Sequence, residues 1–145
     1  MPVPDAIDEV RRAVDNDRQV RVLVVDDEPR ARQLAARALQ SEGIASVTAG
    51  SAHEAMSLLR STPALDVILS DIFMPTTGGL EFLAQVRDEF IGRPWLQLLL
   101  ITGQASVETA VAAMKLDASD YLLKPVDPKT LREAVTHALE RAGSI

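Results

Sequence analysis

The stretch VLVVDDEP, residues 22–29, runs four apolar residues directly into three consecutive acids. The valines favour a buried β-strand, and Pro29 is suited to the first turn of a helix that follows. Carboxylates this close repel one another, by about 1 kcal/mol per pair in water and about 4 kcal/mol at a typical protein surface. The acids therefore need cations nearby, and their position after a strand points to a binding site.

Similar apolar runs recur along the chain and alternate with amphipathic stretches. The apolar runs predict strands at residues 20–25, 45–48, 66–70, 96–101 and 120–123. The amphipathic stretches predict helices at residues 29–41, 51–60, 79–90, 106–116 and 128–141. Ser51 and Glu54 form a predicted capping box at the start of the second of these helices.

Strict alternation of strand and helix predicts the α/β class. Right-handed crossovers then give a doubly wound, five-stranded parallel sheet with helices on both faces. Three of the predicted strands, in the stretches VRVLVV, DVIL and LQLLLI, are apolar almost throughout, as expected when both faces of a sheet are covered. In such sheets ligands bind at the carboxyl ends of the strands.

The composition argues against several classes of function. The net charge of −6 argues against direct binding of nucleic acid or of an anionic membrane. Without cysteine the chain has no disulfides or thiolate metal sites, which fits a reducing cytoplasm. No apolar run approaches the roughly 20 residues that a membrane span needs.

Residues 1–19 are predicted to be an N-terminal extension, and residues 20–145 the main domain. Val3, Ile7, Val10 and Val14 recur at helical spacing, which predicts a short amphipathic helix at residues 4–16. This helix is either a loosely packed extension or a contact for a second copy or a partner.

Polar side chains follow four of the five predicted strands. Asp26 and Asp27 follow the first, Asp71 ends the third, Thr102 ends the fourth and Lys124 ends the fifth. They are expected to meet at one edge of the sheet, where Lys124 supplies a cation. Oxygen ligands with few carboxylates also suit Mg²⁺. Helix capping explains one acid well, but it explains three in succession poorly.

The chain resembles the response-regulator receiver domains (CheY-like) of bacterial two-component signalling, over about residues 20–142. The resemblance rests on four motifs in order: VLVVDDEP, SDIFMP, LLITG and YLLKPV. It implies a flavodoxin-like sheet with strand order 2-1-3-4-5. It also implies a cytoplasmic phosphoprotein that is a phosphoacceptor and not an enzyme acting on other substrates.

The resemblance assigns a role to each residue of the acidic cluster. Asp71 is the phosphoacceptor, which takes a phosphoryl group from a sensor histidine kinase or a phosphotransfer protein. Mg²⁺ is held by Asp27 directly, by Asp26 mainly through water, by Asp71, and by the backbone carbonyl of Phe73. Lys124 pairs with Asp71 and then with a phosphoryl oxygen. The Lys124–Pro125 peptide bond is expected to be cis.

Two further residues are implied to form the switch. Thr102 bonds a phosphoryl oxygen, and Tyr121 turns into the space that Thr102 leaves. The surface of the helix at 106–116, the strand at 120–123 and the helix at 128–141 is thereby changed. That surface is expected to control a downstream effector domain or a homodimer, with no direct contact to nucleic acid or membrane.

The sequence departs from the family at two places and leaves other functions open. Gly78 replaces the aspartate common after the Met-Pro turn, and Phe73 is apolar where many members are polar. The first alternative is a Mg²⁺-dependent phosphatase of the haloacid-dehalogenase type, which requires a second aspartate where Phe73 stands. Others are a flavodoxin-like FMN carrier, disfavoured by the acidic DDEP loop, and a degenerate receiver that only binds proteins.

Overall fold

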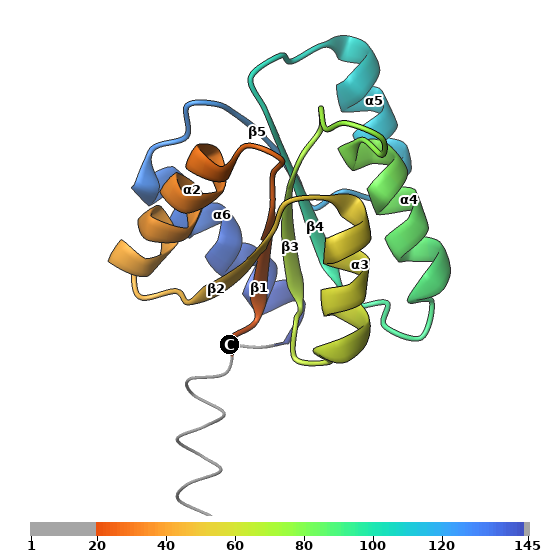
Figure 1. Ribbon diagram of the computed structural model, residues 1–145, viewed down its shortest axis with the longest axis horizontal. Coiled ribbons are helices and arrows are strands. Elements are labelled where there is room, and N and C mark those ends of the chain that lie inside the picture. The colour runs from red at the N-terminus through yellow and green to blue at the C-terminus, as the bar shows by residue number, and fades with distance from the viewer. Residues whose placement is uncertain (1–19, 144–145) are drawn as a thin grey trace, which may run out of the picture.

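The computed structural model describes residues 20–143, in which five strands alternate with five helices (Figure 1). The strands are β1 (Val22–Val25), β2 (Ser46–Ala49), β3 (Val67–Asp71), β4 (Gln97–Thr102) and β5 (Asp120–Leu123). The helices are α2 (Pro29–Ser41), α3 (Ala52–Ser61), α4 (Gly79–Glu89), α5 (Val107–Lys115) and α6 (Pro128–Arg141). The helix predicted at residues 4–16 lies outside the described residues.

The strands form one parallel sheet in the order β2-β1-β3-β4-β5, which confirms the predicted fold and strand order. The register pairs Val25 with both Ala49 and Ser70, and it pairs Thr102 with Leu123. The carboxyl ends of the strands are therefore nearly level. The residues that follow them are brought to one edge of the sheet.

The helices cover both faces of the sheet and make two separate cores. Figure 1 shows α2 and α6 on one side and α3, α4 and α5 on the other. Leu23 and Val25 belong to the core beneath α3 and α4, whereas Val22 and Val24 belong to the core beneath α6. Successive strand residues point to opposite faces, so a sheet covered on both sides needs apolar residues at every position.

The predicted helix boundaries hold to within about one residue, with one difference at the start of α3. Ser51 caps this helix as predicted, since its hydroxyl accepts a hydrogen bond from the Glu54 amide at 3.1 Å. The Glu54 carboxylate, however, accepts from the Gly50 amide at 3.1 Å. The capping box prediction was therefore wrong in its second half, because Glu54 satisfies the amide one residue before the cap.

The start of α4 lies tightly against the end of β3. The Gly79 amide donates to the Ile72 carbonyl at 2.7 Å. A Cβ added to Gly79 would lie 2.9 Å from Ile72 Cα and far inside contact distance of the Asp71 carbonyl oxygen. Only glycine fits at this position, and its backbone supports the strand end that carries Asp71.

None of the helices in residues 20–143 combines the length and the apolar character needed to cross a membrane.

Candidate functional site

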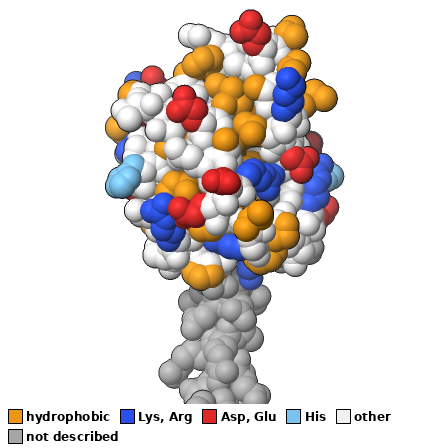
Figure 2. All heavy atoms as spheres, turned by 90° about the vertical axis from the view of Figure 1, so that its right-hand side faces the viewer, with side chains coloured by type: hydrophobic (Ala, Val, Ile, Leu, Met, Phe, Trp, Pro, Cys, Tyr) orange, Lys and Arg blue, Asp and Glu red, His pale blue; other side chains and the backbone are white. Residues whose placement is uncertain are grey.

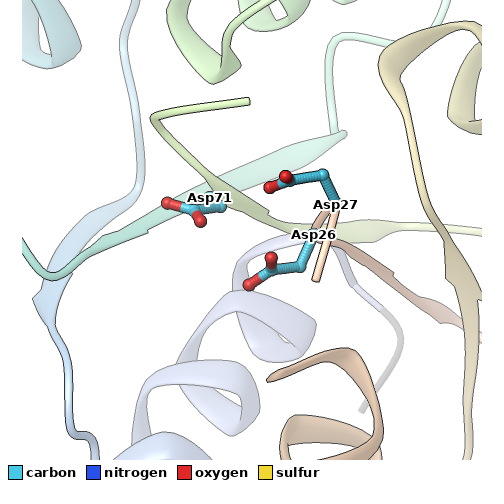
Figure 3. Close-up of side chains that lie close together, drawn as sticks. All are labelled: Asp26, Asp27 and Asp71. Carbon is cyan, nitrogen blue, oxygen red and sulfur yellow. The ribbon is translucent and has the colours of Figure 1, made fainter. Parts of the chain in front are cut away.

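Three carboxylates meet where β1 and β3 end, as the sequence predicted. Oxygen atoms of Asp26, Asp27 and Asp71 lie within 4.8 Å of one another (Figure 3). Asp26 and Asp71 are only 4% and 8% exposed, and Asp27 is half-buried. Repulsion between partly buried charges is stronger than in water, so the cluster stores an unfavourable energy that a cation relieves.

Lys124 supplies one cation to this cluster. Its ammonium group donates to Asp26 Oδ2 at 2.8 Å and to Asp71 Oδ2 at 3.1 Å. The Lys124 amide donates to the Thr102 carbonyl at 2.8 Å, and the Lys124–Pro125 peptide bond is cis as predicted. The sequence predicted Asp71 as the partner of Lys124 but missed the shorter bond to Asp26.

These contacts set the protonation of Lys124. Burial is the largest single influence and lowers the pKa of Lys124, but the hydrogen bonds and charges of Asp26 and Asp71 together outweigh it. The pKa of Lys124 is therefore raised above its ordinary value of 10.5. At neutral pH the side chain is a fixed positive charge between two carboxylates.

This raised pKa predicts how the stability contributed by Lys124 depends on pH. The contribution is complete below the ordinary pKa of 10.5, and it is lost as the pH rises through the higher pKa of the folded protein. Urea unfolding of the wild type and of Lys124→Met should show a more stable wild type at neutral pH. The difference should shrink above pH 10.5; a difference that stays constant there would contradict the ion pairing.

The three aspartates differ in how much of their hydrogen-bonding capacity is used. Asp26 Oδ1 accepts from the Glu28 amide at 3.0 Å and Oδ2 from Lys124, so both of its oxygens are engaged. Asp71 also has both oxygens engaged, but through longer bonds: Oδ1 accepts from the Phe73 amide at 3.4 Å and Oδ2 from Lys124 at 3.1 Å. Within residues 20–143 the Asp27 carboxylate has no hydrogen-bond or ion-pair partner, which leaves it available to a ligand.

Arg32 supports this edge of the sheet from α2, a role that no feature of the sequence indicated. Its guanidinium donates to the Asp26 carbonyl at 2.9 Å. A Cβ added to Gly50 would lie 2.9 Å from the same Arg32 nitrogen, so the side chain passes closely over the end of β2. Arg32 thus fixes the backbone of the first acid and adds positive charge below the cluster.

Thr102 and Tyr121, to which the resemblance assigns the switch, lie on the same face of the sheet. The Thr102 side chain is fully buried, and its hydroxyl accepts from the Gln104 amide at 3.0 Å. Tyr121 pairs in register with Leu100, two residues before Thr102, and its hydroxyl contacts Thr109 Oγ1 at 2.6 Å. Thr102 is therefore tied to the segment that leads into α5, and Tyr121 is tied to the first turn of α5.

Phe73 follows Asp71 by two residues and is 51% exposed. Its backbone amide donates to Asp71 Oδ1 at 3.4 Å. The hypothesis that its side chain shields a group bound to Asp71 stays a prediction.

The arrangement joins a buried carboxylate pair, an available third carboxylate, an ammonium and a hydroxyl on the edge of a 2-1-3-4-5 sheet. The family model described as the response regulator receiver domain matches residues 22–136. The chain belongs to the response regulator receiver domain family. This receiver domain accounts for nearly all of the described residues.

Curated relatives agree with the family. The receiver domain is 37% identical over 124 residues to the alginate biosynthesis transcriptional regulatory protein AlgB of Pseudomonas putida, covering 86% of this chain and 27% of that protein. It is 32% identical over 122 residues to the transcriptional regulatory protein GlrR of Escherichia coli, covering 84% and 27%. The chain therefore spans about a quarter of the length of these relatives.

Solved structures agree as well. A response regulator receiver protein from Pseudomonas putida superimposes with a TM-score of 0.76 at 34% identity, covering 82% of this chain and 97% of that one. A receiver domain protein from Clostridium thermocellum gives a TM-score of 0.78 at 29% identity, covering 86% and 97%. The phosphatase alternative receives no support from these comparisons.

Proposed function

We propose that Asp71 is the phosphoacceptor of this receiver domain, and that a phosphohistidine of a sensor histidine kinase or a phosphotransfer protein is the donor. The observation that carries the proposal is the pairing of Lys124 with Asp71 beside the available carboxylate of Asp27. In this arrangement a nucleophile, a fixed cation and an unused metal ligand meet at one point.

The transfer forms one bond and breaks one bond. A lone pair of an Asp71 carboxylate oxygen forms the new O–P bond, while the N–P bond of the phosphohistidine breaks. The electron pair of that bond goes to the imidazole nitrogen, and the donor leaves as neutral histidine if its other ring nitrogen carries a proton. The product is an acyl phosphate on Asp71, and the domain itself turns over no other substrate.

Mg²⁺ fits the residues at this site. The ligand atoms are all oxygen: Asp27 as a direct ligand, Asp71, the Phe73 carbonyl, and Asp26 acting mainly through water, because its bonds to the Glu28 amide and to Lys124 are shorter than those that Asp71 makes. When bound, the ion neutralises and orients the phosphoryl oxygens. Magnesium binding should also relieve the repulsion within the cluster and stabilise the fold.

Lys124 and Thr102 are proposed to bind the phosphoryl group once it is attached. The Lys124 ammonium already bonds Asp71 Oδ2, so a short movement brings it to a phosphoryl oxygen. The Thr102 hydroxyl uses a lone pair for the Gln104 amide and keeps its hydrogen to donate. The positive charge of Lys124 and the hydroxyl hydrogen of Thr102 both stabilise the negative charge that the phosphoryl group adds, which is about −1.5 to −2 at neutral pH.

The donor is proposed to dock in a groove that borders Lys124. The groove has a volume of about 450 Å³, and its lining is mainly apolar: Ala31, Leu34, Ala35, Ala38, Ile101, Lys124, Pro125, Val126 and Leu131. Leu34 is 60% exposed on α2. Because Lys124 borders both the groove and the acids, a helix seated here would place its histidine near Asp71.

We propose that the surface formed by α5, β5 and α6 passes the signal on, and that it binds a second copy of the chain. Val107, Val111 and Met114 form an exposed stripe at helical spacing on α5, and Leu123 is exposed on β5. Figure 2 shows hydrophobic side chains gathered on the upper part of this side of the molecule. Phosphoryl-dependent self-association, seen by sedimentation, would support this partner.

The length of the relatives suggests which kind of domain receives the signal. AlgB and GlrR are transcriptional regulators about four times as long as the matched region. We propose that this receiver domain likewise controls an effector domain, in the cytoplasm where kinases find ATP. Residues 20–145 remain our proposal for the extent of the receiver domain.

Acetyl phosphate with Mg²⁺ gives a direct test of the function. The intact mass of the protein should rise by one phosphoryl group, and EDTA should prevent the rise. Release of many phosphates per protein molecule would instead favour the phosphatase, and no mass change under any condition would favour the degenerate receiver.

Phe73 is predicted to slow self-hydrolysis of the acyl phosphate. Phe73 is exposed and its backbone amide bonds Asp71 Oδ1, and a polar side chain at this position could orient attacking water. Phe73→Asn should raise the dephosphorylation rate by about tenfold or more, whereas Phe73→Leu should stay close to wild type. Equal rates for all three proteins, followed after removal of the donor, would refute the shielding role.

A further inference from the structure

Thr109 forms a hydroxyl bridge between the first turn of α5 and strand β5. Its Oγ1 lies 2.6 Å from the Tyr121 hydroxyl and 2.9 Å from Ser106 Oγ, and it donates to the Ser106 carbonyl at 3.1 Å. The Thr109 amide donates to Ser106 Oγ at 3.1 Å, which caps the helix. One side chain therefore joins the helix cap to the aromatic residue of the proposed switch.

The protons of this bridge can be assigned in either of two consistent ways. When Thr109 gives its single hydroxyl hydrogen to the Ser106 carbonyl, the Tyr121 hydroxyl donates to Thr109. In the opposite assignment Thr109 donates to Tyr121, and the bond between the two hydroxyls is present either way. Tyr121 is half-buried and its ring packs against the core beneath α5. The bond therefore fixes the direction of a side chain whose remaining contacts are apolar and non-directional.

The same segment is also tied to the phosphoacceptor site. Thr102 accepts from the Gln104 amide at 3.0 Å, and only three residues separate Thr102 from the cap residue Ser106. The Thr102 carbonyl accepts from the Lys124 amide at 2.8 Å. The segment 103–109 is thus held at one end by Thr102, beside Lys124, and at the other end by Tyr121.

We propose that Thr109 is a positioning residue that holds Tyr121 in the arrangement seen here, in which Lys124 is bonded to Asp26 and Asp71. The inference rests on the proposed phosphoacceptor function and adds a restraint on its switch. When Thr102 moves toward a phosphoryl group, Tyr121 can follow only after its bond to Thr109 breaks. Thr109 therefore sets part of the energy difference between the two arrangements.

The expected change in ligand affinity follows from the strength of one hydrogen bond. A net bond of ordinary strength corresponds to about a fivefold change in an equilibrium constant. Removing the Thr109–Tyr121 bond should destabilise only the arrangement of Tyr121 seen here. A ligand that favours the arrangement with Tyr121 turned inward should therefore bind about fivefold more tightly. Thr109→Val removes the hydroxyl at nearly constant shape, Thr109→Ser keeps it, and Tyr121→Phe removes the other partner.

The test is the affinity for beryllofluoride, which mimics a phosphoryl group on a carboxylate, measured by calorimetry with saturating Mg²⁺. Thr109→Val and Tyr121→Phe should each lower the Kd about fivefold. The double variant should gain nothing beyond either single variant, because both remove the same bond. Thr109→Ser should bind as the wild type does.

Three results would overturn the inference: an unchanged Kd in Thr109→Val, a raised Kd, or effects that add in the double variant. The Kd for Mg²⁺ alone and the urea midpoint provide readouts that show whether the site and the fold are intact in each variant. Failure of the wild type itself to bind beryllofluoride would overturn the phosphoacceptor function and this inference together. Equal binding by all the variants would overturn this inference alone.

Discussion

Replacing Asp71 by asparagine is expected to reduce phosphoryl incorporation from acetyl phosphate by about a thousandfold or more. An amide oxygen is a poor nucleophile, and the other two carboxylates at the site are held differently. Asp26 also bonds Lys124, but its second oxygen accepts from the Glu28 amide at 3.0 Å, whereas that of Asp71 accepts only a 3.4 Å bond from the Phe73 amide. Asp27 is not bonded to Lys124. The measurement is the fraction of protein whose intact mass carries a phosphoryl group over time.

A matched control separates the loss of the nucleophile from the loss of one charge. Asp88→Asn makes the same chemical change at an exposed position of α4, and it should leave incorporation unchanged. Asp71→Asn also removes one of three crowded carboxylates, so it should not be less stable than the wild type in urea. Normal incorporation by the folded Asp71→Asn protein would refute the assignment.

Replacing Gly79 by alanine is expected to destabilise the fold by about 3 kcal/mol or more, since the added methyl group meets backbone that cannot rotate away. It would overlap the Asp71 carbonyl and lie 2.9 Å from Ile72 Cα. Relief requires α4 to move away from β3, which would also displace the phosphoacceptor. The measurement is the free energy of unfolding in urea, with the incorporation rate as a second readout.

Gly92→Ala is the control for this substitution. A Cβ at Gly92 meets no atom within 4 Å, so alanine there should change stability by no more than about 0.5 kcal/mol. Similar stabilities for the two variants would show that the close approach of α4 to β3 does not constrain the protein.

The fold could be predicted because its signals are local and repeat in the same order. The three central strands carry apolar runs, VLVV in β1, VIL in β3 and LLLI in β4, and each of the five strands is followed by an amphipathic stretch, as VLVV is by residues 29–41. Alternation and the handedness of crossovers then leave few arrangements. The strand order 2-1-3-4-5 was implied only by the resemblance to receiver domains, and the structure confirms it.

The acidic cluster could be predicted for a similar reason. Each residue of the site ends a strand or follows one directly, and the carboxyl ends of parallel strands share an edge: Asp71 and Thr102 end β3 and β4, whereas Asp26, Asp27 and Lys124 follow β1 and β5. The structure brings the three aspartates and Lys124 together. Their chemical roles stay predictions until the measurements above are made.

The supporting contacts could not be predicted, because they depend on where side chains from different elements meet. Arg32 reaches the Asp26 carbonyl from α2, and Thr109 reaches Tyr121 from α5. An arginine or a threonine on an amphipathic helix is ordinarily a solvated residue, so neither has a sequence signal. The tight fit of Gly79 likewise appears only once α4 is placed against β3.

The most direct test of the central claim is to locate the phosphoryl group itself. Borohydride reduces an acyl phosphate on aspartate to homoserine, and peptide sequencing by mass spectrometry then identifies the residue. After reaction of the wild type with acetyl phosphate and Mg²⁺, homoserine is predicted at position 71 and at no other aspartate. Homoserine at Asp26 or Asp27, or no homoserine in protein that carries a phosphoryl group, would contradict the account.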